Sequence, residues 1–169
     1  MADHVLAQGL QGASLRPLAA AAGTSDRMLL HYFVDKEELL TATLSLVTQR
    51  LIAVLEAAQT EPLPFQRLLS LLAVMLKDKQ IQPYTRLWLE LVAAAAGDKE
   101  PFRSIARQIA GSFQDWIARA LYVEQEEERE ALAALTLALV EGLIIFDALG
   151  DDTKRMAALA GIALVQSKS

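Results

Sequence analysis

Apolar residues in the middle of the chain repeat at the spacing of one face of an α-helix. Leu40, Leu44, Val47, Leu51 and Val54 follow one another at spacings of 4, 3, 4 and 3. The chain is 53% hydrophobic, with alanine and leucine, both strong helix formers, dominating. No segment alternates with the period of two that a half-buried strand requires. The sequence therefore predicts an all-α fold.

Glycine and proline divide the 169 residues into about nine helical stretches. Side chains suited to capping precede most of them, namely Ser14, Ser25, Asp35, Asp98 and either Asp151 or Asp152. The expected helices cover approximately residues 2–8, 15–22, 26–32, 36–59, 65–77, 83–96, 99–122, 125–149 and 153–166. Glu38 stands three residues after Asp35, as in a capping box.

Composition excludes several classes of protein. The chain has no cysteine, which rules out disulfides and thiolate metal sites and fits a reducing cytosol. Its first residues lack the basic start and apolar core of a signal peptide. Residues 131–149 are long enough to span a membrane, but Glu141 and Asp147 interrupt them, so a helix buried among other helices is the preferred interpretation. The net charge of −5 argues against indiscriminate nucleic-acid binding.

Residues 14–36 have the pattern of two short helices joined by a tight turn. Gly23 stands at the turn, and the small Ala19 allows the second helix to pass close by. The apolar face that the two helices would share consists of Leu18, Ala22, Leu29 and Phe33. This arrangement places a recognition helix in the major groove of DNA, although an ordinary helical hairpin shows the same spacing.

The amino-acid sequence of this segment is more specific evidence than the spacing of its apolar residues. Residues 18–25 read Leu-Ala-Ala-Ala-Ala-Gly-Thr-Ser, residues 30–33 read Leu-His-Tyr-Phe, and residues 36–40 read Lys-Glu-Glu-Leu-Leu. Over residues 9–40 the chain resembles the DNA-binding module of the tetracycline-repressor (TetR) family. The resemblance implies a helix-turn-helix domain over residues 1–40 and a helical ligand-binding and dimerisation domain over residues 41–169.

The resemblance also implies roles for individual residues. The positions that match DNA contacts of the family are Arg16, Thr24, Ser25, Arg27, Met28, His31, Tyr32 and Lys36. Arg27 suits a guanine edge and Met28 a thymine methyl group, while the last three match contacts to the phosphate backbone. Four of them have a structural alternative, namely Ser25 as a helix cap, Tyr32 as part of the small core, Arg27 in a surface ion pair and His31 as a solvated side chain.

Two features depart from the family pattern. Leu30 replaces a tyrosine whose hydroxyl binds a phosphate. The first helix is short, and residues 1–46 carry three basic residues against five acidic ones, a formal charge of −2. Phosphate binding favours a positive surface. A late-assigned start, a truncated chain and weak or absent DNA binding all fit this pattern.

The second half of the chain carries most of the aromatic residues. Residues of this kind at helical spacing are usually core, but they also fit an apolar pocket with a few polar groups. The expected ligand-binding residues are Tyr84, Trp88, Phe113, Trp116 and Glu141. Arg86 and Glu90, four residues apart, are expected to form a surface ion pair instead.

The last two expected helices fit a dimer interface. Residues 132–149 are apolar on nearly every side, and the helix that follows offers the small residues Ala157, Ala158, Ala160, Gly161 and Ala163. A four-helix contact between two copies would cover both helices, as the resemblance also implies; an internal core is the alternative.

The sequence is thus interpreted as a cytoplasmic, ligand-responsive repressor that binds double-stranded DNA as a homodimer, with an unknown and largely apolar effector. The alternative is a dimeric helical module that binds a ligand or a protein and has weak or no DNA binding. No catalytic, metal or cofactor motif is recognisable, so an enzyme is not expected.

Overall fold

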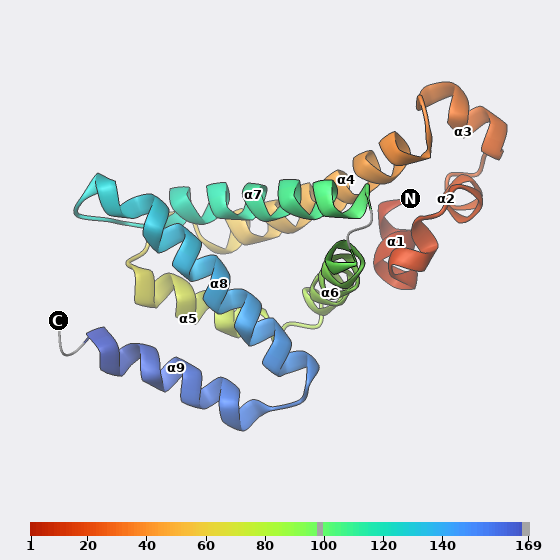
Figure 1. The fold of residues 1–169 in the computed structure, drawn as a ribbon. Helices are drawn as coiled ribbons and strands as arrows, with labels where there is room; N and C mark the ends of the chain where they lie inside the picture. The colour runs from red at the N-terminus through yellow and green to blue at the C-terminus, as the bar shows by residue number, and fades with distance from the viewer. Residues whose placement is uncertain (98–99, 167–169) are drawn as a thin grey trace. The chain divides into compact units, whose positions relative to one another are not determined.

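A computed structural model describes the backbone of residues 1–97 and 100–166 and the side chains up to residue 162. The expected cap Asp98 and the side chain of Ala163 lie outside these described residues. The described chain contains α-helices and two short 3₁₀ helices and no strand (Figure 1). The α-helices are α1 (Ala2–Gln8), α2 (Leu15–Ala21), α3 (Asp26–Tyr32), α4 (Lys36–Ala58), α5 (Phe65–Met75), α6 (Gln82–Ala96), α7 (Phe102–Ala120), α8 (Arg129–Ala148) and α9 (Asp152–Gln166). The all-α prediction is confirmed.

The helices belong to two compact units that are described separately. Unit 1 consists of Met1–Ala57 and Lys79–Gly111, and unit 2 consists of Ala58–Asp78 and Ser112–Ser169. Neither unit is continuous in sequence. The domain boundary expected at residue 40 stays a prediction.

Glycine ends two of the helices as the sequence predicts. Gly23 has a φ of 67° and follows α2, where the N–H of Thr24 donates to the carbonyl of Ala19 at 3.0 Å and the N–H of Gly23 donates to that of Ala20 at 3.1 Å. Gly150, also at φ 67°, ends α8 in the same way. These bonds satisfy carbonyl groups that the end of a helix leaves unpaired.

Most of the expected caps at helix starts are present. The backbone N–H of Glu38 donates to Oδ1 of Asp35 at 2.8 Å, and the Glu38 carboxylate accepts from the N–H of Val34. Asp151, rather than Asp152, caps α9 by accepting from the N–H of Lys154 at 3.0 Å. Ser14 occupies the cap position of α2 without a side-chain hydrogen bond.

The core of unit 1 lies between the N-terminal helices, α4 and α6. The fully buried side chains there include Val5, Leu18, Leu39, Leu44 and Leu91. The 3₁₀ helix Leu10–Ala13 and α1 both contact α6. Asp3 of α1 also pairs with Arg50 of α4, with Oδ1 2.6 Å from Nη1. The N-terminal helices are therefore held to the rest of their unit by apolar packing and by polar contacts.

Unit 2 is built on α5, α8 and α9, which contact one another in all three pairs (Figure 1). Leu68 and Thr136 are fully buried there, and the hydroxyl of Thr136 donates to the carbonyl of Leu132. A single parallel bridge joins Leu63 to Leu121 just after α7 ends. This bridge turns the chain out of the helix at Ala120, two residues earlier than expected.

The start of α8 also differs from the expectation. Residues Glu126–Glu128 form a 3₁₀ helix, and the α-helix begins at Arg129 rather than near Gln125. Nη1 of Arg129 donates to the carbonyls of Ala118 and Leu121 at 2.6 and 2.8 Å, and its Nε lies 2.6 Å from Glu126. Arg129 therefore anchors this turn to the end of α7.

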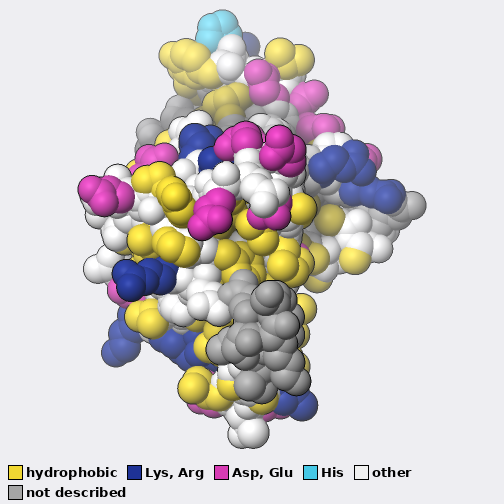
Figure 2. Space-filling model, turned by 90° about the vertical axis from the view of Figure 1, so that its left-hand side faces the viewer, with side chains coloured by type: hydrophobic (Ala, Val, Ile, Leu, Met, Phe, Trp, Pro, Cys, Tyr) yellow, Lys and Arg dark blue, Asp and Glu magenta, His cyan; other side chains and the backbone are white. Residues whose placement is uncertain are grey.

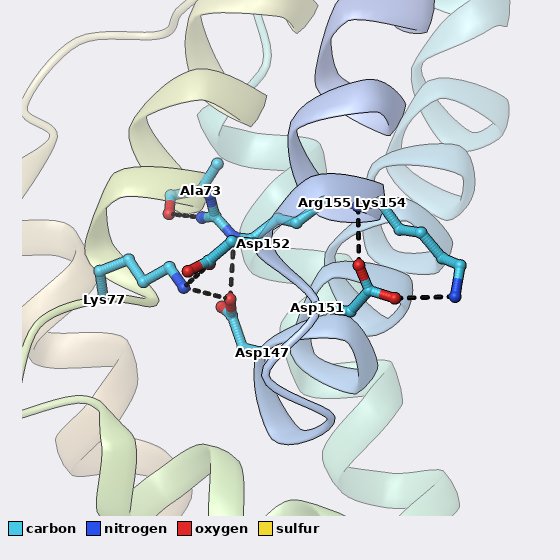
Figure 3. A network of polar contacts seen from close by, with 7 residues as sticks. All are labelled: Ala73, Lys77, Asp147, Asp151, Asp152, Lys154 and Arg155. Atoms are coloured by element: carbon cyan, nitrogen blue, oxygen red, sulfur yellow. Dashed lines mark hydrogen bonds and ion pairs between the residues drawn. The ribbon is translucent and has the colours of Figure 1, made fainter.

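A charged cluster ties the first turn of α9 to α5 and α8 (Figure 3). Arg155, only 6% exposed, donates to the carbonyl of Ala73, and its Nε lies 3.0 Å from Asp147. Nζ of Lys77 lies 2.6 Å from Asp147 and 2.8 Å from Asp152. Asp147 thus forms ion pairs with both Lys77 and Arg155.

Two helical stretches, Lys36–Ala58 and Glu126–Ala148, are long and apolar enough to cross a membrane by length and composition only. The core helices of globular proteins pass the same test. In unit 1, α4 buries seven of its side chains. In unit 2, α8 buries only Ala133, Thr136, Leu143 and Ile144, so the complete burial expected for it is not reached within this chain.

Candidate nucleic-acid interface and ligand site

The helix-turn-helix is built by a small core and a capped second helix. Leu18 and Ala19 of α2 and Leu29 of α3 are buried, and the two helices contact each other. Oγ of Ser25 accepts a hydrogen bond of 3.2 Å from the N–H of Met28, which fixes the first turn of α3. The expected cap is confirmed, and the geometry leaves the remaining faces of α3 exposed.

The residues expected to contact DNA lie at the surface. Arg16, Ser25, Arg27, Met28, His31, Tyr32 and Lys36 are exposed, and Thr24 is half-buried. His31 and Tyr32 contact edge to face with their ring centroids 5.7 Å apart. Tyr32 is 73% exposed, which excludes it as a member of the small core. Arg27 forms none of the described ion pairs, so the alternative of a surface pair finds no support among the described residues.

The acidic residues near the helix-turn-helix are mostly engaged in structural contacts. Asp35 and Glu38 accept from backbone N–H groups at the start of α4, and Asp3 pairs with Arg50. Asp26 lies 4.0 Å from the exposed Arg16, close enough for a weak ion pair. Arg50, which lies outside residues 1–46, offsets the charge of Asp3, whereas the backbone hydrogen bonds of Asp35 and Glu38 leave their negative charges in place.

The residues expected to bind a ligand fall in both compact units. Tyr84 and Trp88 are half-buried on α6 in unit 1, whereas Phe113, Trp116 and Glu141 belong to unit 2. Trp116 is buried like a core residue. Glu141 is half-buried on α8, and burial raises the pKa of its carboxyl group above the ordinary value. A pocket formed by these five residues stays a prediction.

A groove that the sequence did not indicate lies in unit 1. It has a volume of about 390 Å³ and lies between the last turns of α6 and the first turns of α7. Its lining consists of Val92, Ala95, Ala96, Arg103, Ala106 and Arg107. Alanine-rich ends of helices give no signal of a groove, because only the crossing of the two helices creates it. No group of three or more His, Asp or Glu side chains suited to a metal occurs within the described ranges.

The expected ion pair between Arg86 and Glu90 is confirmed, with Nε 3.4 Å from Oε1. Sequence reasoning missed the second contact of this carboxylate. Oε2 of Glu90 accepts a hydrogen bond of 2.6 Å from the backbone N–H of Leu10. Glu90 therefore joins α6 to the 3₁₀ helix that leads into the helix-turn-helix.

The N-terminal helices match a known family of proteins. Residues 2–43 match the family described as bacterial regulatory proteins, tetR family. The chain is 31% identical over 146 residues to the HTH-type transcriptional regulator BetI of Rhizobium meliloti (strain 1021), covering 82% of this chain and 69% of BetI. It is 27% identical over 146 residues to the HTH-type transcriptional regulator PksA of Bacillus subtilis (strain 168), covering 83% of this chain and 71% of PksA.

Solved structures share the fold over nearly the whole chain. A Rhodococcus sp. protein described as a TetR-family transcriptional regulator superposes with a TM-score of 0.74 at 22% identity, covering 97% of this chain and 93% of the other. A transcriptional regulator of Rhodococcus sp. Rha1 superposes with a TM-score of 0.70 at 25% identity, covering 99% and 92%. With its helix-turn-helix and these relatives, the chain belongs to the tetR family of bacterial regulatory proteins and is a DNA-binding transcriptional regulator.

Proposed function

We propose that the protein is a cytoplasmic, ligand-responsive repressor that binds a palindromic operator as a homodimer and has no enzymatic activity. The observation that carries the proposal is the capped α3, which is held against α2 through Leu29 and leaves Arg27 and Met28 exposed. A short, fixed helix with an exposed basic start is the element that reads base edges in the major groove.

We propose that a second copy of the protein covers the exposed apolar surface of α8 and α9. Leu135 and Ile145 on α8 are 48% and 49% exposed, and Met156 on α9 is 60% exposed. Hydrophobic side chains also lie in the open between charged ones on the face that Figure 2 shows. Apolar surface of this kind favours association, and a two-fold axis uses the same patch on both copies.

The dimer would determine the operator. Two recognition helices related by a two-fold axis enter successive major grooves about 34–36 Å apart, so the half-sites form an inverted repeat. An effector releases such a repressor only if it binds the released state more tightly than the DNA-bound state. Tyr84, Trp88, Phe113, Trp116 and Glu141 stay the proposed effector contacts.

The alternative function is a dimeric helical module that binds a ligand or a protein and binds DNA weakly or not at all. Leu30 favours it, because leucine cannot donate a hydrogen bond to a phosphate. The excess of acidic residues over residues 1–46 favours it as well.

One experiment separates the two functions. Duplex DNA from the region upstream of the protein's own gene is titrated with the protein at several salt concentrations. The repressor is expected to bind with an affinity that falls steeply with salt, and Arg27→Ala is expected to weaken it. Arg67→Ala, on the exposed side of α5, is the matched control. No salt-sensitive binding would support the alternative.

The dimer is tested by sedimentation equilibrium at micromolar concentration. Ile145→Glu is expected to yield monomers, since it places a charge in the proposed interface. Val74→Glu is the control, because Val74 is exposed on α5 of the same unit. A monomeric mass for the unmodified chain would contradict the proposed dimer.

A further inference from the structure

The second helix of the helix-turn-helix, α3, carries one acidic residue, Asp26, in its first turn. A carboxylate is unexpected there, because a surface that binds DNA neutralises phosphates with basic side chains. Asp35 and Glu38 accept hydrogen bonds from the backbone at the start of α4. Asp26 contacts the side chain of Arg16 on α2 instead. Asp26 therefore joins the two helices that form the DNA-binding surface.

The backbone on both sides of this contact is fixed. The N–H of Thr24 donates to the carbonyl of Ala19 and closes the turn between the helices, and Ser25 caps α3. Nε of Arg16 lies 4.0 Å from Oδ2 of Asp26, and the Arg16 side chain is 90% exposed. Because the contact is at Nε, it does not occupy the two Nη groups of Arg16.

A guanidinium group held in this way suits one base. Its two Nη groups can donate together to O6 and N7 of guanine, the commonest specific contact in the major groove. An unrestrained arginine samples many rotamers and reaches phosphates as well as bases. A carboxylate beside Nε reduces that freedom, and its negative charge disfavours a phosphate at the same place.

We propose that Asp26 is a positioning residue that holds Arg16 for one guanine in each half of the operator. Asp26 acts through Nε of Arg16 and does not contact the base itself. The contact between the two exposed side chains is weak in water and becomes stronger when bound DNA excludes water from it. The proposal rests on the proposed function and deepens it by naming how one base is selected.

The test starts from the DNA sequence that the full chain selects from a pool of random duplexes. Each base pair of a half-site is then exchanged in turn, and fluorescence anisotropy measures the affinity of each variant for each duplex. Arg16→Ala is expected to lose about 5- to 150-fold in discrimination at one G·C pair. Asp26→Ala is expected to lose roughly fivefold at the same pair, the upper end of what an exposed ion pair contributes. Asp26→Asn keeps an acceptor for the Nε–H group and should lose less.

Further measurements separate positioning of Arg16 from a general effect of charge. Asp26→Ala should bind unrelated duplexes more tightly, because it removes a negative charge, while its discrimination falls. Glu37→Ala, the matched control, removes an exposed acid from the first turn of α4 and should leave discrimination unchanged. In the Arg16→Ala background, Asp26→Ala should have no further effect on discrimination. Replacement of the guanine by 7-deazaguanine, which lacks the N7 acceptor, should weaken binding of the unmodified chain but not of Arg16→Ala.

Several results would overturn the proposal. Unchanged discrimination in Asp26→Ala would show that Arg16 needs no positioning. An equal loss of affinity on all duplexes would assign Asp26 to the stability of α3, where a first-turn acid is favourable. A loss of discrimination that persists in the Arg16→Ala background would mean that Asp26 reads a base itself. If the unmodified chain selects no sequence, the proposed function fails as well, whereas the other three results leave it intact.

Discussion

Oε2 of Glu90 lies 2.6 Å from the backbone nitrogen of Leu10, and this hydrogen bond joins positions 80 residues apart. The bond is partly buried, and the same carboxylate pairs with Arg86 through its other oxygen. One side chain on α6 thus holds the entry to the helix-turn-helix in place.

Removal of this acceptor should destabilise the N-terminal helices. Glu90→Ala leaves the N–H of Leu10 without its partner, and we expect a loss of about 1–3 kcal/mol in the free energy of unfolding. Glu90→Gln keeps an acceptor and should lose less. Denaturant titration measures both values, and hydrogen exchange of the Leu10 amide localises the change. Unaltered protection of that amide in Glu90→Ala would contradict the assignment.

Gly9 should tolerate substitution less well than Gly23. Both have positive φ, 72° and 67°, but a Cβ at Gly9 would lie 2.6 Å from Oε1 of Glu90, whereas nothing lies within 4 Å of one at Gly23. Gly9 also has a ψ of −167°, a backbone conformation that essentially only glycine adopts. We expect Gly23→Ala to cost about 1 kcal/mol and Gly9→Ala about 2–3 kcal/mol or more. Equal thermal midpoints for the two variants would refute this ranking.

Asp147→Asn should destabilise unit 2 strongly. It leaves the buried guanidinium of Arg155 without its countercharge, and breaking a buried pair from one side costs about 3–5 kcal/mol. The matched control is Lys154→Met, which removes the exposed pair with Asp151 and should cost no more than about 1 kcal/mol. Urea denaturation compares the two variants, and similar losses would show that burial of Arg155 is not decisive.

Glu141→Gln should stabilise the protein at neutral pH. Burial raises the folded-state pKa of this carboxyl above its unfolded value, so its ionised form penalises the folded state at a pH above the folded pKa. The gain in stability is expected to shrink as the pH falls through the pKa that Glu141 has in the folded state. It should vanish below the pKa that Glu141 has in the unfolded state. Thermal melts between pH 7 and pH 4, at one protein concentration, follow this difference. Glu130→Gln, also on α8, is the control for loss of one negative charge, and a gain that does not change with pH would count against this cause.

Arg27 and Lys36 should affect DNA binding differently. If the protein acts as proposed, Arg27→Ala removes a contact to a base edge. The expected loss of binding free energy is about 1–3 kcal/mol, or about 5- to 150-fold in affinity, and it applies to the preferred operator only. Lys36→Ala removes a phosphate contact, so it should weaken all sequences alike and reduce the salt slope by about 1. Fluorescence anisotropy with operator and unrelated duplexes measures both effects. An equal loss on both duplexes for Arg27→Ala would exclude base recognition by this residue.

Local features of the fold could be predicted from the sequence, because they depend on neighbouring residues. The ends of α2 and α8 follow from Gly23 and Gly150, and the start of α3 follows from Ser25. The pair Arg86–Glu90 follows from a spacing of four residues on one helix.

Long-range contacts could not be predicted, since nothing in a single sequence relates their partners. The link from Glu90 to Leu10 and the burial of Arg155 against Ala73 depend on how distant helices meet. For the same reason the five aromatic and acidic residues expected to share a pocket fall in two units. The groove between α6 and α7 could not be predicted either, because it depends on how the ends of these two helices lie against each other.

The contact between Leu10 and Glu90 also has a consequence for the order in which the newly made protein folds. Ribosomes add about 5–20 residues per second, so about 4–16 seconds separate the synthesis of these two residues. Throughout that interval α1 and the 3₁₀ helix lack both the hydrogen bond and the apolar cover that α6 provides. The part of the protein that is made first is therefore completed only by a helix made much later. A nascent chain released before α6 has emerged would carry a helix-turn-helix without its anchor.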